Sequence, residues 1–337
     1  MSFKNVGNPN SNYRLNSFEL EYGKVLEDIE VNFKTNGTPI YDDDGYIINA
    51  IVFCPTYKGS QSILQGAHSY LKNEGTFSES EFFFITVTSF GLPPSYAPSS
   101  SGLENGFPEY SIKDVVNFKR KFLSEKFKIR QLLGIMGEED GGYEVFTWAC
   151  EYPDEMKFIL LFNSDFKVSG YRYIINKGYA AIVDLVDYAD VYDVSLSKAI
   201  VAINTFLFAQ ASSEKVLNKL SNDEIEALLE DFIDEGLYLD VYDVSYRNNA
   251  VLNYNVEDKL SDVAAKTLII YSDDNVLFNE PMDLDILRRY IDDVNVLSYS
   301  SRKENYYDEE DYSIIGQEVI SFFDKSIENL KDFQRSG

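Results

Sequence analysis

The residues best suited to do chemistry lie together in the segment from Gly137 to Gly142, which reads Gly-Glu-Glu-Asp-Gly-Gly. An apolar run at 131–136 precedes it and a helical pattern follows, so the chain must turn sharply through glycines from a strand into a helix. Such a turn is a nucleophile elbow, in which small residues lift one side chain above the sheet at a helix N-terminus. By the spacing Gly-x-Ser-x-Gly-Gly, Gly137, Gly141 and Gly142 match the glycines, and Glu139 takes the position of the nucleophile.

A carboxylate in that position has limited chemistry. It can attack an acyl centre and form an ester intermediate, but a base must then activate water against the ester. A negative side chain at a helix N-terminus is also favourable in itself, by about 0.3–1 kcal/mol on an exposed surface. A second possibility is therefore that the Glu139 carboxylate itself binds the backbone N–H groups that would otherwise bind an oxyanion.

The acidic run Glu138-Glu139-Asp140 has another interpretation, as a cation site. Together with Glu304 or Asp308 it offers the oxygen ligands that Mg²⁺ and Ca²⁺ prefer. Acidic runs are more often solvated surface, however. We therefore expect no metal and no cofactor.

Histidine, the usual acid-base group near neutral pH, occurs once in the chain, as His68. Nucleophilic catalysis by a serine needs a neutral imidazole that takes the proton and later returns it to the leaving group. His68 lies far upstream of the elbow in a polar stretch, and we interpret it as a loop or helix residue.

The composition is that of a folded, acidic protein. The 337 residues are 45% apolar, include 24 Phe and 25 Tyr, and carry a formal charge of −26. The negative potential repels phosphate backbones and anionic lipids, so we expect neither nucleic acid nor membrane as a partner. No secretory signal pattern and no span of about 18 uncharged residues is present, which predicts a cytoplasmic protein. Cys54 and Cys150 are predicted to be reduced core residues.

Alternating and apolar runs indicate the elements that position the elbow. Residues 18–34 alternate around Tyr22-Gly23-Lys24, as an antiparallel hairpin does. Almost wholly apolar runs predict strands that are covered on both faces. These runs are 47–53, 82–87, 131–136, 158–162 and 267–271, and a further strand is expected at 294–299.

Helical stretches alternate with these strands, which predicts a mostly parallel sheet flanked by helices. They are expected at 112–125 after a Ser111 cap, at 143–151, at 283–291 and at 313–331. Between 165 and 263 the pattern changes to long amphipathic helices, among them 195–211 and 221–235. We therefore predict a core of residues 14–164 and 264–330, with a helical cap at 165–263.

The order and spacing of several motifs resemble the homoserine O-acetyltransferase-like family of the α/β hydrolases, over nearly the whole chain. These motifs are Phe18-Glu-Leu-Glu-Tyr-Gly23, Cys54-Pro-Thr-Tyr57-Lys-Gly-Ser60, Ser89-Phe-Gly91, the elbow, and Trp148-Ala-Cys-Glu-Tyr-Pro-Asp154. The resemblance implies an α/β-hydrolase fold and a reaction that transfers an acyl group through a serine acyl-enzyme.

The resemblance also implies where a Ser-His-Asp triad would lie, and each position is altered. The serine position holds Glu139, the acid position holds Asn275 beside two aspartates, and the histidine position falls near Lys303. Tyr57 lies in the loop that borders the oxyanion hole in the family. No histidine follows strand 294–299.

These alterations predict a catalytically degenerate member that binds a small molecule or a protein in the cleft under the cap. One alternative is an enzyme of changed mechanism, an acyltransferase or hydrolase that uses the Glu139 carboxylate. Another is a structural subunit that forms a homodimer or pairs with an active homologue.

Overall fold

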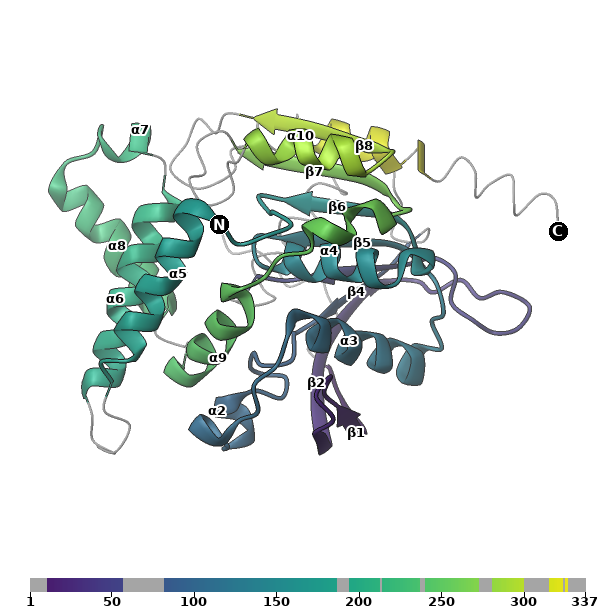
Figure 1. Ribbon diagram of the computed structural model, residues 1–337, viewed down its shortest axis with the longest axis horizontal. Coiled ribbons are helices and arrows are strands. Elements are labelled where there is room, and N and C mark those ends of the chain that lie inside the picture. The colour runs from purple at the N-terminus through teal and green to yellow at the C-terminus, as the bar shows by residue number, and fades with distance from the viewer. Residues whose placement is uncertain are drawn as a thin grey trace.

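The computed structural model describes residues 11–56, 82–186, 194–212, 214–236, 240–272, 281–299, 315–323 and 325–326. Its centre is an eight-stranded sheet with helices packed against it (Figure 1). The strand order is β1-β2-β4-β3-β5-β6-β7-β8. The predicted architecture, a mostly parallel sheet flanked by helices, is confirmed.

The predicted hairpin forms one edge of the sheet. Strand β1 (Ser11–Glu19) pairs antiparallel with β2 (Val25–Gly37). The turn between them contains Gly23 at a φ of 88°, a conformation that glycine adopts without steric cost. Strand β2 then pairs antiparallel with β4 (Phe83–Val87), which joins the hairpin to the rest of the sheet.

The other pairings are parallel, as the long apolar runs predict. The strands that make them with β4 are β3 (Ala50–Cys54), β5 (Leu132–Glu138), β6 (Met156–Phe162), β7 (Lys266–Ser272) and β8 (Val294–Tyr299). All five residues of β3 are buried. Both faces of the sheet are therefore covered at its centre.

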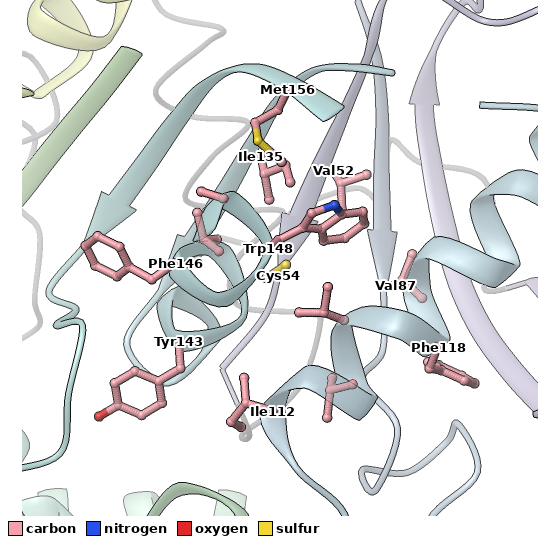
Figure 2. Close-up of a cluster of buried hydrophobic side chains, with 14 of the residues drawn as sticks. Val52, Cys54, Val87, Ile112, Phe118, Ile135, Tyr143, Phe146, Trp148 and Met156 are labelled. Atoms are coloured by element: carbon pink, nitrogen blue, oxygen red, sulfur yellow. The ribbon is translucent and has the colours of Figure 1, made fainter. Parts of the chain in front are cut away.

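Alternate residues of one strand enter different cores, because successive side chains point to opposite faces. Val52 and Cys54 belong to the larger core, which also holds Trp148 of helix α4 (Gly141–Glu151) after strand β5 (Figure 2). Ile51 and Phe53 belong to a second core on the opposite face. That second face is covered by the helical residues 315–323.

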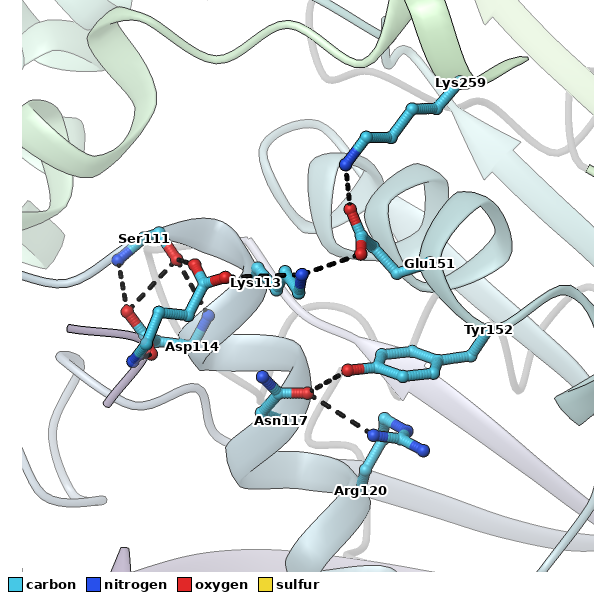
Figure 3. Close-up of polar contacts among 9 residues, drawn as sticks. Ser111, Lys113, Asp114, Asn117, Arg120, Glu151, Tyr152 and Lys259 are labelled. Atoms are coloured by element: carbon cyan, nitrogen blue, oxygen red, sulfur yellow. Dashed lines mark hydrogen bonds and ion pairs between the residues drawn. The ribbon is translucent and has the colours of Figure 1, made fainter. Parts of the chain in front are cut away.

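Helices α3 (Ile112–Phe127), α4 (Gly141–Glu151) and α10 (Pro281–Tyr290) pack on the first face. Helix α3 begins at the predicted Ser111 cap, which is a capping box. The Asp114 backbone N–H donates to Ser111 Oγ at 3.0 Å, and the Ser111 N–H donates to the Asp114 carboxylate at 2.9 Å (Figure 3). Between α3 and α4, Glu151 accepts from Lys113 and Lys259.

Among the described residues, five α-helices follow β6 before the chain returns to β7. They are α5 (Gly170–Val183), α6 (Val194–Ala211), α7 (Glu214–Leu217), α8 (Asn222–Gly236) and α9 (Val241–Leu252). They lie together beyond one end of the sheet (Figure 1) and have a small core of their own, including Ile203 and Val244. The division into a core of 14–164 and 264–330 with a cap at 165–263 stays a prediction.

The remaining elements are short. They are α2 (Pro98–Ser101) and the 3₁₀ turns Glu104–Gly106, Pro153–Glu155 and Glu257–Asp262. Of the helix predicted at 313–331, positions 315–323 are helical, and 313, 314, 324 and 327–331 lie outside the described residues. Within the described part of the chain, no helix has both the length and the apolarity needed to cross a membrane.

Candidate functional site

The turn between β5 and α4 has the backbone of an elbow. Glu139 adopts a φ of 51°, which is uncommon for a residue with a Cβ and is sterically costly. Its N–H donates to the Phe162 carbonyl at 2.9 Å, and its own carbonyl accepts from the Gly142 N–H at 3.0 Å and from Ser164 Oγ at 2.6 Å. Backbone bonds on both sides therefore hold position 139 in this conformation.

The three glycines around Glu139 are required by close contacts. A Cβ at Gly141 would lie 2.2 Å from the Cys54 carbonyl oxygen, and one at Gly142 would lie 2.0 Å from Ser164 Oγ. A Cβ at Gly137 would lie 2.6 Å from a methyl group of Val145. The end of β3, the segment after β6 and helix α4 thus converge on this turn.

Asp140, the N-cap residue of α4, is buried and bound by a residue of the inserted helices. Arg247 of α9 donates to Asp140 Oδ2 from Nη2 at 2.8 Å and from Nε at 3.1 Å. Arg247 also contacts the Glu144 carboxylate at 3.2 Å. The elbow and α9 are therefore joined by a buried ion pair.

Glu144 extends this network into the interior. Lys119 of α3 lies 2.5 Å from its carboxylate, and Ser89 Oγ donates to it at 2.7 Å. Burial alone would raise the pKa of Glu144, but the charges of Lys119 and Arg247 outweigh it and hold the pKa below its ordinary value. Two cations and two carboxylates thus balance in the buried network of Lys119, Glu144, Arg247 and Asp140.

A cleft opens between the elbow and the inserted helices. It measures about 640 Å³ including its open mouth. It is lined by Glu139, Asp140, Arg172, Ile175, Asn176, Tyr179, Ile203, Leu207, Gln210, Val244, Arg247, Asn248 and Val251. The half-buried Glu139 is thus at the floor of a cavity that has polar and aliphatic walls.

Sequence reasoning identified the floor of this cleft but not its walls. The structure brings Glu139 and Asp140 into the cleft, while Glu138 ends β5 and is not a lining residue. Tyr57, Asn275 and Lys303 lie outside the described residues. His68, Glu304 and Asp308 are also outside them, so the triad positions implied by the resemblance stay predictions.

The wall residues carried a weak signal in the sequence. In α9, Val244, Arg247, Asn248 and Val251 follow the spacing of one helical face. A guanidinium and an amide on an otherwise aliphatic face are unusual unless they have polar partners. Arg247 was detectable in this way, although its partner Asp140 was not.

Neither cysteine offers a reactive alternative to Glu139. Cys54 is fully buried at the end of β3, and burial raises the pKa of its thiol to about 12. Burial likewise raises the pKa of Cys150 in α4 to about 12. Because the thiolate is the nucleophilic form, both thiols are inert near neutral pH. Within the described ranges, no three His, Cys, Asp or Glu side chains are grouped to hold a metal ion.

No family model matches the chain. A protein named probable acyltransferase from Methanothermobacter thermautotrophicus is 31% identical over 277 residues, which cover 82% of this chain and 85% of that protein. A homoserine O-acetyltransferase from Methanohalobium evestigatum is 29% identical over 47% of this chain but only 35% of its own length.

Solved structures resemble the fold of this protein over nearly the whole length of the chain. An acetylester hydrolase from Corynebacterium glutamicum superposes with a TM-score of 0.80 at 19% identity, covering 94% of this chain and 96% of that one. Homoserine O-acetyltransferase from Bacillus anthracis gives 0.74 at 17% identity, covering 94% and 97%. At these identities the likeness shows a shared fold.

Proposed function

The chain belongs to the homoserine O-acetyltransferase-like family of the α/β-hydrolase fold, and from this premise we propose that it is a binding protein that has lost the family's acyl-transfer chemistry. The observation that carries the proposal is Glu139. It stands on the elbow, at a φ of 51°, where the resemblance implies a serine nucleophile. A carboxylate there cannot form the acyl-serine intermediate.

The supply of acid-base groups supports the same conclusion. The only imidazole of the chain belongs to His68, which precedes β4, and residues 300–312 after β8 contain no histidine. A lysine such as Lys303 is cationic near neutral pH unless it is strongly desolvated. The chain therefore lacks the usual group that would deprotonate a nucleophile and protonate a leaving group in this region.

The cleft itself favours binding. Its aliphatic residues and several hydrogen-bonding side chains give it the composition of a small-molecule site. The elbow is kept in shape by Asp140 and Arg247, which are joined at 2.8 Å. A buried ion pair thus joins the elbow to the inserted helices at the edge of the cleft.

Turnover assays test the proposal directly. The wild-type protein and Glu139→Ala are given a panel of acyl-CoA thioesters and p-nitrophenyl esters, between about pH 5 and 9 to span the titration of plausible bases. We expect neither protein to exceed the uncatalysed rate. Turnover that is lost in Glu139→Ala but kept in Glu138→Ala would overturn the proposal, and so would turnover that survives in both.

A second candidate function rests on the placement of the same carboxylate. Glu139 lines the cleft at the position of a nucleophile, so an enzyme that forms an ester on Glu139 is the alternative. Its signature would be an acyl mass added to the peptide that contains Glu139 after incubation with an activated ester. No such adduct is expected from a binding protein.

A further inference from the structure

Three helices present one face each to the cleft. The spacing i, i+3, i+4, i+7 places residues on one side of a helix, and the lining residues of α5 and α9 follow it. In α5 they are Arg172, Ile175, Asn176 and Tyr179, in α9 Val244, Arg247, Asn248 and Val251, and in α6 Ile203, Leu207 and Gln210. Each wall therefore combines aliphatic surface with at least one side chain that donates hydrogen bonds.

The formal charges of the described residues that line the cleft cancel. Glu139 and Asp140 are negative, Arg172 and Arg247 are positive, and no other described lining residue is charged. Asp140 neutralises Arg247 at 2.8 Å. The other two charged groups, Glu139 and Arg172, both act on the Tyr179 hydroxyl. Burial raises the pKa of this hydroxyl, the Arg172 charge lowers it and the Glu139 charge raises it. The described lining thus carries two negative and two positive side chains.

A balanced cleft discriminates against charged ligands. An anionic ligand would add an uncompensated negative charge to a poorly solvated site, where such a charge is costly. The formal charge of −26 on the whole chain adds to this penalty. A cationic ligand would likewise add an uncompensated positive charge.

The polar groups still to be satisfied in the walls are donors. Asn176 Nδ2, Gln210 Nε2 and Arg247 Nη1 have no hydrogen-bond partner within the described part of the chain. Their residues are buried, with exposed fractions of 6%, 4% and 4%. The Tyr179 hydroxyl donates to Gln210 Oε1 at 3.0 Å, which commits the oxygen of that amide and leaves its nitrogen for another group. These nitrogens are enclosed by their neighbours. Since buried polar groups are normally bonded, a ligand whose oxygen acceptor displaces those neighbours and reaches the nitrogens is favoured here.

We infer that the cleft binds an uncharged small molecule with an oxygen acceptor and an apolar body, and that the Glu139 carboxylate is the residue that excludes carboxylate ligands. The acceptor meets the side chains of Asn176, Gln210 and Arg247, and the apolar body packs on aliphatic residues such as Leu207 and Val251. This inference rests on the proposed function, because it takes the cleft as a binding site. It adds the chemical class of the ligand and assigns Glu139 a selective role.

Three probes with one six-carbon skeleton test the charge rule: hexanamide, hexanoate and hexylamine. Dissociation constants for the full chain are measured by titration in ligand-observed NMR at about pH 7.5, where the acid and the amine are both ionised. We expect hexanamide to bind the wild-type protein about tenfold more tightly than hexanoate. In Glu139→Gln the described lining residues carry one net positive charge, so hexanoate should gain about tenfold relative to hexanamide.

Two further variants separate the parts of the inference. Glu138→Gln removes the same charge one residue away, outside the cleft lining, and should change the hexanamide-to-hexanoate ratio by less than about twofold. Asn176→Leu keeps the size but removes a donor, and should weaken hexanamide binding by about fivefold. Circular dichroism confirms that each variant is folded.

Several results would overturn the inference. They are hexanoate or hexylamine binding the wild-type protein as tightly as hexanamide, a ratio unchanged in Glu139→Gln, or no binding of any probe. The ester and thioester assays report on the proposed function separately. A protein that turns over esters but prefers hexanamide would support the charge rule and contradict the proposed function. A protein that neither turns over esters nor prefers hexanamide would contradict the charge rule and leave the proposed function standing.

Discussion

Arg247 on α9 and Asp140 at the start of α4 are 107 residues apart in the chain, yet they form a two-bond contact in which Arg247 Nε and Nη2 both donate to Asp140 Oδ2. The pair fixes the inserted helices to the elbow. It also belongs to the buried network that continues through Glu144 to Lys119. A change at Arg247 therefore affects the fold and the cleft together.

The first prediction concerns the loss of this guanidinium. Arg247→Met leaves the network with two buried carboxylates, Asp140 and Glu144, and one cation, Lys119, which contacts Glu144. Breaking a buried pair by removing one partner typically costs about 3–5 kcal/mol, and we expect a loss of that size in the free energy of unfolding. Urea denaturation of the two proteins measures it.

Arg247→Lys is the matched control for charge. It keeps the cation but cannot donate to Asp140 and Glu144 with the geometry of a guanidinium, so its loss should be smaller than that of Arg247→Met. A loss below about 1 kcal/mol in Arg247→Met would contradict the view that the network is a coupled ion-pair system.

The second prediction uses two glycines with opposite surroundings. Gly141→Ala places a methyl group 2.2 Å from the Cys54 backbone oxygen, which cannot move without distorting β3. We expect it to lose at least about 2–3 kcal/mol of stability, as other overpacked sites do. Gly178→Ala in α5 meets nothing within 4 Å and should gain about 0.5–1 kcal/mol, because alanine favours a helix. Equal effects of the two substitutions in thermal unfolding would contradict this account.

The fold was predictable because local patterns report on burial. Strand β3 is apolar at every position, and in the structure Val52 and Ile51 indeed enter cores on opposite faces. The Ser111 cap was readable for a similar reason, since its partner Asp114 is only three residues away. Both are properties of a short stretch of chain.

The walls of the cleft were less predictable because they depend on how distant helices pack. Nothing near Asp140 in the sequence indicates that Arg247 will bind it. The resemblance to the family drew attention to the elbow and to positions such as Asn275, but it gave no role to Arg172 or Gln210. Glu139 was identified because Gly137, Gly141 and Gly142 lie around it in the sequence, at positions where close contacts leave no room for a Cβ.

The third prediction tests the capping box of α3. Ser111→Ala removes the oxygen that accepts from the Asp114 N–H, and we expect a loss of about 1 kcal/mol, typical of an N-cap serine. Asp114→Ala should cost more, because this buried carboxylate accepts from the N–H groups of both Ser111 and Glu21, at 2.9 and 2.7 Å. Urea denaturation would contradict the assignment if Asp114→Ala cost less than Ser111→Ala.

The last prediction is a pH dependence that arises after β6. Asp165 is buried there and accepts from the Phe166 N–H at 2.7 Å. Burial, and then the neighbouring Asp283 carboxylate, raise the pKa of Asp165 to about 7. Asp283 is itself held by Lys167 at 2.9 Å. An aspartate in an unfolded chain titrates near about 3.9, so the folded state holds the extra proton between these two values.

The sign follows from linkage. A pKa raised in the folded state contributes stability that is present below about pH 4 and is lost as the pH rises through about 7. Asp165→Asn cannot ionise and keeps a carbonyl oxygen for the Phe166 N–H. Its free energy of unfolding relative to the wild type should therefore increase from about pH 4 to about pH 7 and level off above it. Urea titrations of both proteins across this range measure the difference, and parallel curves would show that Asp165 does not carry the extra proton.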